Sequence, residues 1–134
     1  MYFDLKKIKA QIEQVYEEML AFRRDLHMHP ELSEQETRTE EKICSLLDAL
    51  QIPYQRGVAG HGVCAVIRGT TADRTVGIRA DIDALPVTEQ TGLAYASSTP
   101  GVMHACGHDM HAAILLGTAA ILKQNADTLP GTVK

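Results

Sequence analysis

The spacing of the apolar residues alternates along this chain between the period of a helix and that of a strand. Apolar side chains recur at three- and four-residue steps from Leu5 to Leu26 and again over residues 109–124, which predicts two amphipathic helices. Between them, short apolar runs such as residues 63–67 are bounded by glycine, proline and polar residues, as strands are. This alternation predicts an α/β fold with a mixed, partly parallel sheet.

Proline and capping residues predict where the first two helices begin and end. The first should stop just before Pro30, because a proline pushes the preceding residue out of the helical region. Ser33 and Glu36 fit a capping box, in which each side chain satisfies an orphan backbone N–H. They predict the start of a second helix, which should end before Pro53.

The remaining segments predict strands and one long loop. Asp81 and Asp83 follow a predicted strand, and open α/β sheets usually place their chemistry at the carboxyl ends of strands. Either carboxylate could also simply cap a turn. Residues 86–103 are rich in Thr, Ser, Gly and Pro, and loops of this length in compact domains are often functional. The predicted strands are residues 54–57, 63–67, 75–79 and 132–134.

Composition excludes several classes of function. The formal net charge of −4 comes without a cluster of Lys or Arg, so we expect no nucleic-acid partner. The longest apolar run, residues 112–122, is shorter than the roughly 18 residues of a membrane span, and no signal-peptide pattern opens the chain. Three cysteines without a pairing pattern favour a reducing compartment, so we expect a cytoplasmic protein. Two of them, Cys44 and Cys64, are expected in the core.

The densest group of metal-binding residue types is the segment His104–His111, which holds three His, one Cys and one Asp. Thiolate and imidazole are preferred ligands of zinc and its neighbours. Gly107 tolerates a tight backbone path that would let Cys106 and His108 converge. Asp109 is placed either to cap the third helix or to accept a hydrogen bond from a ligand histidine.

Two ligands do not complete a metal site. A catalytic zinc needs at least three protein ligands, for which Asp81 and Asp83 are local candidates. The spacing of the Cys and His is not one of the strong zinc templates, so the residue types alone leave open that both are structural. His27 and His29 look like a helix-end feature, and His61 like a surface or internally satisfied residue.

Three segments of the chain resemble one enzyme family, in the family's order and at similar separations. They are Arg24–Ser33, Arg79–Pro86 and Pro100–Asp109. The family comprises metal-dependent amidohydrolases and metallopeptidases, including hippurate hydrolases, N-acyl-amino-acid amidohydrolases (aminoacylases) and auxin-conjugate hydrolases. The resemblance implies that residues 1–134 are the N-terminal portion of a three-layer, zinc-peptidase-like catalytic domain, truncated before an inserted lid domain.

The resemblance also implies roles for individual residues. Cys106 resembles a ligand that bridges two divalent metal ions, which could be zinc, manganese, cobalt or nickel. His108 resembles a terminal ligand of one of them. Asp83 and Asp109 resemble residues that support the ligands without binding metal, and Asp81 is a further candidate for that supporting role.

The implied activity is hydrolysis of the amide bond of N-acyl amino acids, in which two metal ions activate water and a carboxylate takes its proton. His111 is not assigned as a ligand. The general base, the remaining ligands and the lid domain, through which the full-length protein would form a homodimer, are expected after Lys134, so the 134-residue chain should be inactive. The alternatives are a dipeptidase or aminopeptidase on the same scaffold, or a non-catalytic truncated or degenerate member. A structural zinc module is disfavoured, because only two good ligands are present.

Overall fold

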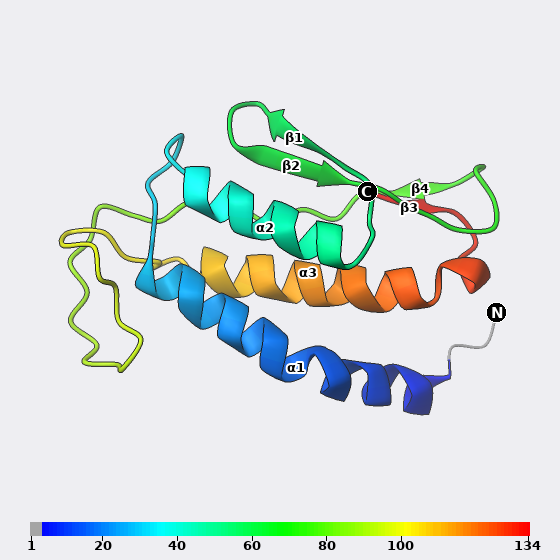
Figure 1. Ribbon diagram of the computed structural model, residues 1–134, viewed down its shortest axis with the longest axis horizontal. Helices are drawn as coiled ribbons and strands as arrows, with labels where there is room; N and C mark the ends of the chain where they lie inside the picture. Colours follow the sequence, from blue (N-terminus) through cyan, green and yellow to red (C-terminus); the bar gives the residue numbers. More distant parts are fainter. Residues whose placement is uncertain (1–3) are drawn as a thin grey trace.

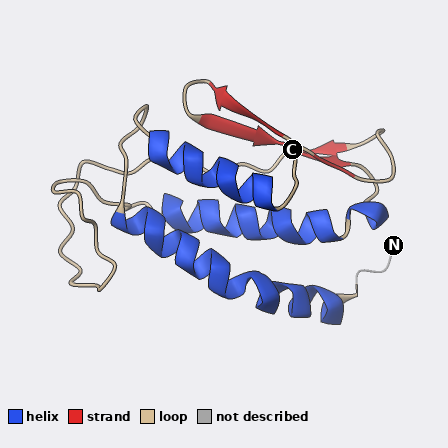
Figure 2. Cartoon of the chain, in the orientation of Figure 1, coloured by secondary structure: helices blue, strands red, loops and turns tan. Residues whose placement is uncertain are grey.

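In residues 4–134, the part of the chain that the computed structural model describes, helices and strands follow each other in the predicted order (Figures 1 and 2). The strands lie along one side of the helices, which confirms the prediction of an α/β fold. The elements are α1 (Leu5–Met28), α2 (Thr37–Ala49), β1 (Tyr54–Val58), β2 (Gly62–Ala65), β3 (Ile67–Arg68), β4 (Thr75–Val76), α3 (His108–Gln124), the short 3-10 helix η1 (Ala126–Thr128) and β5 (Thr132–Val133).

Helix α1 begins and ends where the sequence predicts. The carboxylate of Asp4 caps its first turn by accepting the backbone N–H groups of Lys6 (3.0 Å) and Lys7 (3.2 Å). Its C-cap is His29, which directly precedes a proline. The ring of His29 donates from Nδ1 to the backbone oxygen of Asp25 (2.8 Å), so its prediction as a helix-end feature is confirmed.

The start of α2 differs from the prediction. The helix begins four residues after Ser33, and Glu36 at its N-cap makes no capping hydrogen bond through its side chain, so the capping box is wrong. The carboxylate of Glu31 caps the helix instead, because its two oxygens accept hydrogen bonds from the backbone N–H groups of Arg38 (3.0 Å) and Thr39 (2.8 Å). A carboxylate from the segment before the turn thus satisfies two orphan donors of the first helical turn.

Three of the strands form a mixed sheet, as predicted. Strand β5 is central and pairs antiparallel with β3 and parallel with β4, while β1 and β2 form a separate antiparallel hairpin. The predicted strand over residues 63–67 is divided at Val66, whose N–H still donates to the backbone oxygen of Pro53 (2.9 Å), next to β1. This break lets the preceding residues pair with β1 and the following ones with β5.

The predicted strand over residues 75–79 is shorter than expected. Pairing continues only to Ile78, whose N–H donates to the backbone oxygen of Lys134 (2.8 Å). Within residues 4–134 no strand lies beside the segment that follows, so residues 77–83 have no regular ladder. That segment leads directly to Asp83.

Two helical interfaces build the core. Helices α2 and α3 pack against the strands around Leu47, Ile67 and Leu116. On its other side α3 packs along α1, where Gly117 allows a close approach, since a Cβ atom there would lie 3.1 Å from Cγ of Met19. Together these contacts fix the first turn of α3 relative to the end of α1.

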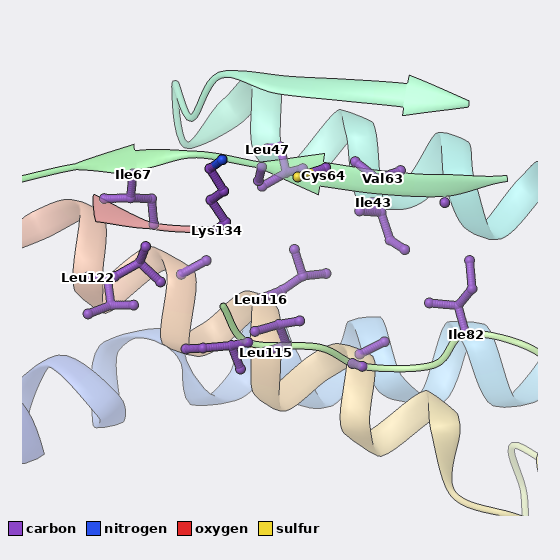
Figure 3. A pocket seen from close by; sticks show the side chains of 17 residues that line it. Ile43, Leu47, Val63, Cys64, Ile67, Ile82, Leu115, Leu116, Leu122 and Lys134 are labelled. Carbon is purple, nitrogen blue, oxygen red and sulfur yellow. The ribbon is translucent and has the colours of Figure 1, made fainter. Parts of the chain in front are cut away.

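An apolar cavity of about 250 Å³ lies between α2, α3 and the strands (Figure 3). Its walls include Ile43 and Leu116 on the helices and Val63 on β2. Cys64 also lines it and is half-buried, whereas Cys44 is fully buried as the sequence predicts.

Residues 86–103 form the predicted long loop, which lies at the end of the molecule where α1 ends and α3 begins (Figure 1, left). An isolated antiparallel bridge closes it at its base, with backbone hydrogen bonds of 2.9 and 3.0 Å between Leu85 and Met103. Asp83 and Cys106 therefore flank the two ends of one closed loop.

Among residues 4–134, no helix combines the length and the apolar character that crossing a membrane would require.

Candidate metal centre

His108 is the first residue of α3, and its ring is held from one side. Gly107, at a φ of 77°, turns the chain into the helix just before it. The Nδ1 atom of His108 lies 2.9 Å from the backbone oxygen of Asp83 and 2.8 Å from its carboxylate Oδ1. Both oxygens are acceptors, so Nδ1 carries the proton and Nε2 keeps its lone pair. Within the described residues Nε2 makes no hydrogen bond and is free to bind a metal ion.

Cys106 lies two residues before this histidine, on the same turn. It is a free cysteine and is exposed, in contrast to the buried Cys44. One thiol and one imidazole nitrogen on a single turn suit zinc and neighbouring divalent metals. Residues 4–134 contain no cluster of three or more His, Cys, Asp and Glu side chains around one point. Cys106 and His108 alone are fewer than the three protein ligands that a catalytic zinc site needs.

The other two predicted aspartates face elsewhere. Asp81 pairs through Oδ1 with Nε (3.0 Å) and Nη2 (2.7 Å) of Arg79, at the exposed edge of the segment before Asp83. Asp109 does not cap α3, since the N-cap is Gly107 and no side chain bonds there, so that prediction is wrong. Its carboxylate instead points toward α1, because the preceding turn directs the two neighbouring side chains to different faces of the helix.

The partners of Asp109 are residues that the sequence did not single out as a site. Its Oδ2 atom lies 2.7 Å from Nδ1 of His27 and 2.8 Å from Nε of Arg23, and the carboxylate is fully buried. The other ring nitrogen of His27 lies 3.1 Å from Oε1 of Glu89. His27 lies in the last turn of α1, as predicted, but its ring also contacts two distant segments, which the sequence did not predict. No local pattern could reveal these contacts, because Glu89 and Asp109 lie 62 and 82 residues away along the chain.

The two other histidines of the segment His104–His111 differ in burial. His104 is buried, and within the described residues neither of its ring nitrogens has a hydrogen-bond partner. Burial lowers its pKa, although the nearby Asp109 carboxylate opposes that shift. His111 is exposed, with its ring centre 5.8 Å from that of His108, which is consistent with their shared helical face.

Comparisons with known proteins identify relatives of this chain. Residues 77–134 match the profile of peptidase family M20/M25/M40. The chain is 42% identical over 129 residues to an N-acyl-L-amino acid amidohydrolase of Geobacillus stearothermophilus, covering 96% of this chain and 35% of that protein. It is 40% identical over 131 residues to thermostable carboxypeptidase 1 of Saccharolobus solfataricus, covering 97% of this chain and 33% of that protein.

A solved structure shares the fold as well as the sequence. The crystal structure of the Bacillus subtilis YXEP protein, a dinuclear metal-binding peptidase of the M20 family, matches with a TM-score of 0.86 and 47% identity. The match covers 90% of this chain and 34% of that one. The chain thus spans about a third of the length of these relatives. The resemblance found in the three sequence segments is confirmed, and residues 77–134 carry part of a peptidase family M20/M25/M40 domain.

Proposed function

We propose that the full-length protein is a metal-dependent amidohydrolase that cleaves the amide bond of N-acyl amino acids, with Cys106 and His108 among its metal ligands. The observation that carries this proposal is the hydrogen bond from Nδ1 of His108 to Asp83. A ligand histidine almost always donates its second N–H to a carboxylate or carbonyl, which fixes the ring and the tautomer. His108 has both kinds of acceptor in one residue.

The residues of this chain would prepare the site rather than carry out proton transfer. A bound pair of divalent metal ions would lower the pKa of water and polarise the scissile carbonyl. Cys106 would add the negative charge of its thiolate, and Asp83 would keep the lone pair of His108 directed at the metal. The carboxylates of Asp81, Asp83 and Asp109 are already engaged by Arg79, His108 and His27.

Each of these three carboxylates thus already holds another side chain, and the resemblance implies a different residue as the general base. For this reason we propose that the 134-residue chain does not catalyse the reaction alone. A zinc titration of this chain tests the point. We expect binding weaker than that of the full-length protein, since two protein ligands hold zinc less tightly than three or four. Tight binding of two ions per chain would contradict the proposal.

The substrate class rests on the relatives. One of them is an N-acyl-L-amino acid amidohydrolase, which supports an N-acyl amino acid as the substrate. A second candidate is hydrolysis of a peptide bond, which the carboxypeptidase relative favours. A panel of N-acetyl amino acids, N-benzoyl amino acids and dipeptides separates the two. We expect kcat/KM to be highest on the N-acyl compounds, and a preference for dipeptides would favour the second candidate.

The metal and the cellular location are also proposals. The thiol and imidazole donors suit zinc, manganese, cobalt or nickel, and activity after metal removal and reloading with each ion would rank them. All three cysteines are free thiols. Free thiols fit the reducing cytoplasm, which we propose as the location.

Substitution of Cys106 tests the centre directly. In the full-length protein, C106A should lose bound metal and lower the rate of deacylation by more than about a hundredfold, beyond the 10–100-fold typical of removing an outer partner of a ligand. The matched control is C64A, because Cys64 is also a free thiol but lines the apolar cavity. Retention of metal and activity in C106A would show that this cysteine is not a ligand.

A further inference from the structure

His27 joins two segments that are far apart in the sequence. It lies in the last turn of α1, and its ring is 4% exposed. Nδ1 lies 2.7 Å from Oδ2 of Asp109, in the first turn of α3. Nε2 lies 3.1 Å from Oε1 of Glu89, in the loop 86–103. One ring therefore contacts both the loop and the helix that begins with His108.

Glu89 organises the loop around this contact. Its Oε2 atom accepts the backbone N–H of Ser97 (2.6 Å), and its Oε1 atom accepts the hydroxyl of Thr91. Burial raises the pKa of Glu89, but the hydrogen bonds from Ser97, Thr91 and His27 outweigh it and hold the pKa at about 2. The carboxylate is ionised at neutral pH, so Nε2 of His27 must donate the hydrogen bond.

Other contacts dock the same loop on the end of α1. The backbone N–H of Ser98 donates to the backbone oxygen of Met28 (2.8 Å), the residue after His27. The ring of Tyr95 lies edge-on to His27, with a centroid separation of 5.7 Å. It also covers the guanidinium groups of Arg23 (5.2 Å) and Arg24 (5.0 Å). The loop thus shields the His27 ring from solvent.

Asp109 carries the contact to the candidate metal ligand. It is 0% exposed and directly follows His108. Its Oδ2 atom is bound only by residues of α1, namely His27 and Arg23, and its Oδ1 atom has no partner within the described residues. Among the described residues, both groups that hold this carboxylate in the first turn of α3 therefore come from α1.

We propose that His27 is a positioning residue that couples the docking of the loop 86–103, through Glu89, to the orientation of His108, through Asp109. When the loop is docked, Glu89 fixes the plane of the His27 ring, and that ring fixes Asp109. Loss of either hydrogen bond lets the first turn of α3 shift and weakens the hold of Asp83 on His108. This inference rests on the proposed metal site.

Zinc affinity of the full-length protein provides the first test. H27Q keeps a side chain of similar reach but can satisfy only one carboxylate, and we expect it to raise the Kd about tenfold, at the lower end of the range for outer partners of a ligand. E89Q should raise the Kd by less. The double variant should match H27Q alone, because Glu89 acts through His27. The matched control is H29Q, two residues further along, which should leave the Kd unchanged.

A spectroscopic readout separates positioning from a general loss of stability. In the metal-free full-length protein labelled with ¹⁵N-histidine, the ring signals of His108 should shift in H27Q and in E89Q but not in H29Q. Additive effects of H27Q and E89Q on the Kd, or unchanged His108 signals in either variant, would overturn the coupling. If H108A leaves the zinc Kd unchanged, the proposed metal site is wrong. The ring signals of His108 in H27Q and E89Q would still test the coupling, because they are measured in the metal-free protein.

Discussion

The Nδ1 atom of His108 faces two oxygen atoms of a single residue, because both the backbone carbonyl and the carboxylate of Asp83 lie within 2.9 Å of it. Removing the carboxylate in D83A should leave the ring only one acceptor. We expect the zinc Kd of the full-length protein to rise about 10–100-fold, as is typical when the partner of a ligand histidine is lost. Competition for zinc with a chromophoric chelator measures the Kd of D83A and of the wild type.

The matched control is D81A. Asp81 precedes Asp83 by two residues, but its carboxylate pairs with Arg79 in an exposed position and does not contact His108. D81A should therefore change the Kd little. Equal effects of the two variants would mean that acidic charge near the site matters, rather than the hydrogen bond from His108.

A second prediction concerns the segment between η1 and β5, which passes close to the residue that follows β3. A Cβ atom on Gly69 would overlap the backbone oxygen of Leu129 and lie 2.5 Å from that of Gly131. G69A should therefore lower the free energy of unfolding by about 1–3 kcal/mol, as overpacking does. On Gly77 the same atom would meet nothing within 4 Å, so G77A should be neutral or stabilising by about 0.4–1 kcal/mol. Urea unfolding of the two variants measures the contrast, and equal losses would contradict it.

The core makes a third prediction. Leu47 is 1% exposed and lies in the apolar cluster between α2 and the strands. L47A should lower the free energy of unfolding by about 2–5 kcal/mol, because it removes apolar contacts and leaves a cavity. Leu5, at 70% exposure, provides the control, and L5A should stay within about 0.5 kcal/mol of the wild type. Thermal and urea unfolding should rank the variants in the same order.

A fourth prediction is a pH dependence at the β1–β2 hairpin. The carboxylate of Glu40 on α2 accepts hydrogen bonds from Nδ1 of His61 (3.0 Å), Nε of Arg56 (3.0 Å) and the backbone N–H of Gly57 (3.1 Å). The hydrogen bond from His61, followed by that from Arg56, lowers the pKa of Glu40. The same bond to Glu40 raises the pKa of His61. His61 is thus internally satisfied, as its sequence context suggested.

The two shifts define a pH window for this contribution. The stabilisation by Glu40 is fully present above its ordinary pKa of 4.5 and is lost as the pH falls through the lowered folded value. That by His61 is fully present below its ordinary pKa of 6.5 and is lost as the pH rises through the raised folded value. Both stabilising contributions are fully present between pH 4.5 and 6.5.

The difference in urea midpoint between wild type and E40Q should therefore be largest in that window and shrink on both sides. E41Q, on an exposed position of the same helix, is the control and should show no such maximum. A difference that stays constant from pH 3 to 9 would rule out the pair as its source.

The local sequence pattern was sufficient to predict helices α1 and α3 and to select Cys106 and His108 as candidate metal ligands. The helical period located α1 and α3 to within a residue or two, because each buries one continuous apolar stripe. Cys106 and His108 could be picked out because both stand on one turn, where a short motif is visible in the sequence. Their ligand roles, and the expected dimerisation of the full-length protein, stay predictions.

Contacts between distant segments were beyond the sequence. The start of α2 depends on Glu31, which precedes the helix and reaches forward across a turn to its first backbone N–H groups. The partners of Asp83 and Asp109 depend on the fold, which places Asp83 beside His108 and Asp109 beside His27. A carboxylate beside a histidine in the sequence is thus a poor guide to its partner in space.

The bridge between Leu85 and Met103 has a consequence for how this scaffold can change over evolution. It fastens the two ends of the 86–103 loop, so insertions or deletions near the loop tip need not displace Asp83 on one side or Cys106 on the other. Each doubling of loop length adds only about 0.6 kcal/mol of closure entropy. The loop tip can therefore diversify in length and sequence, provided that Glu89 keeps its contact with His27, while the turn that carries Cys106 and His108 stays in place.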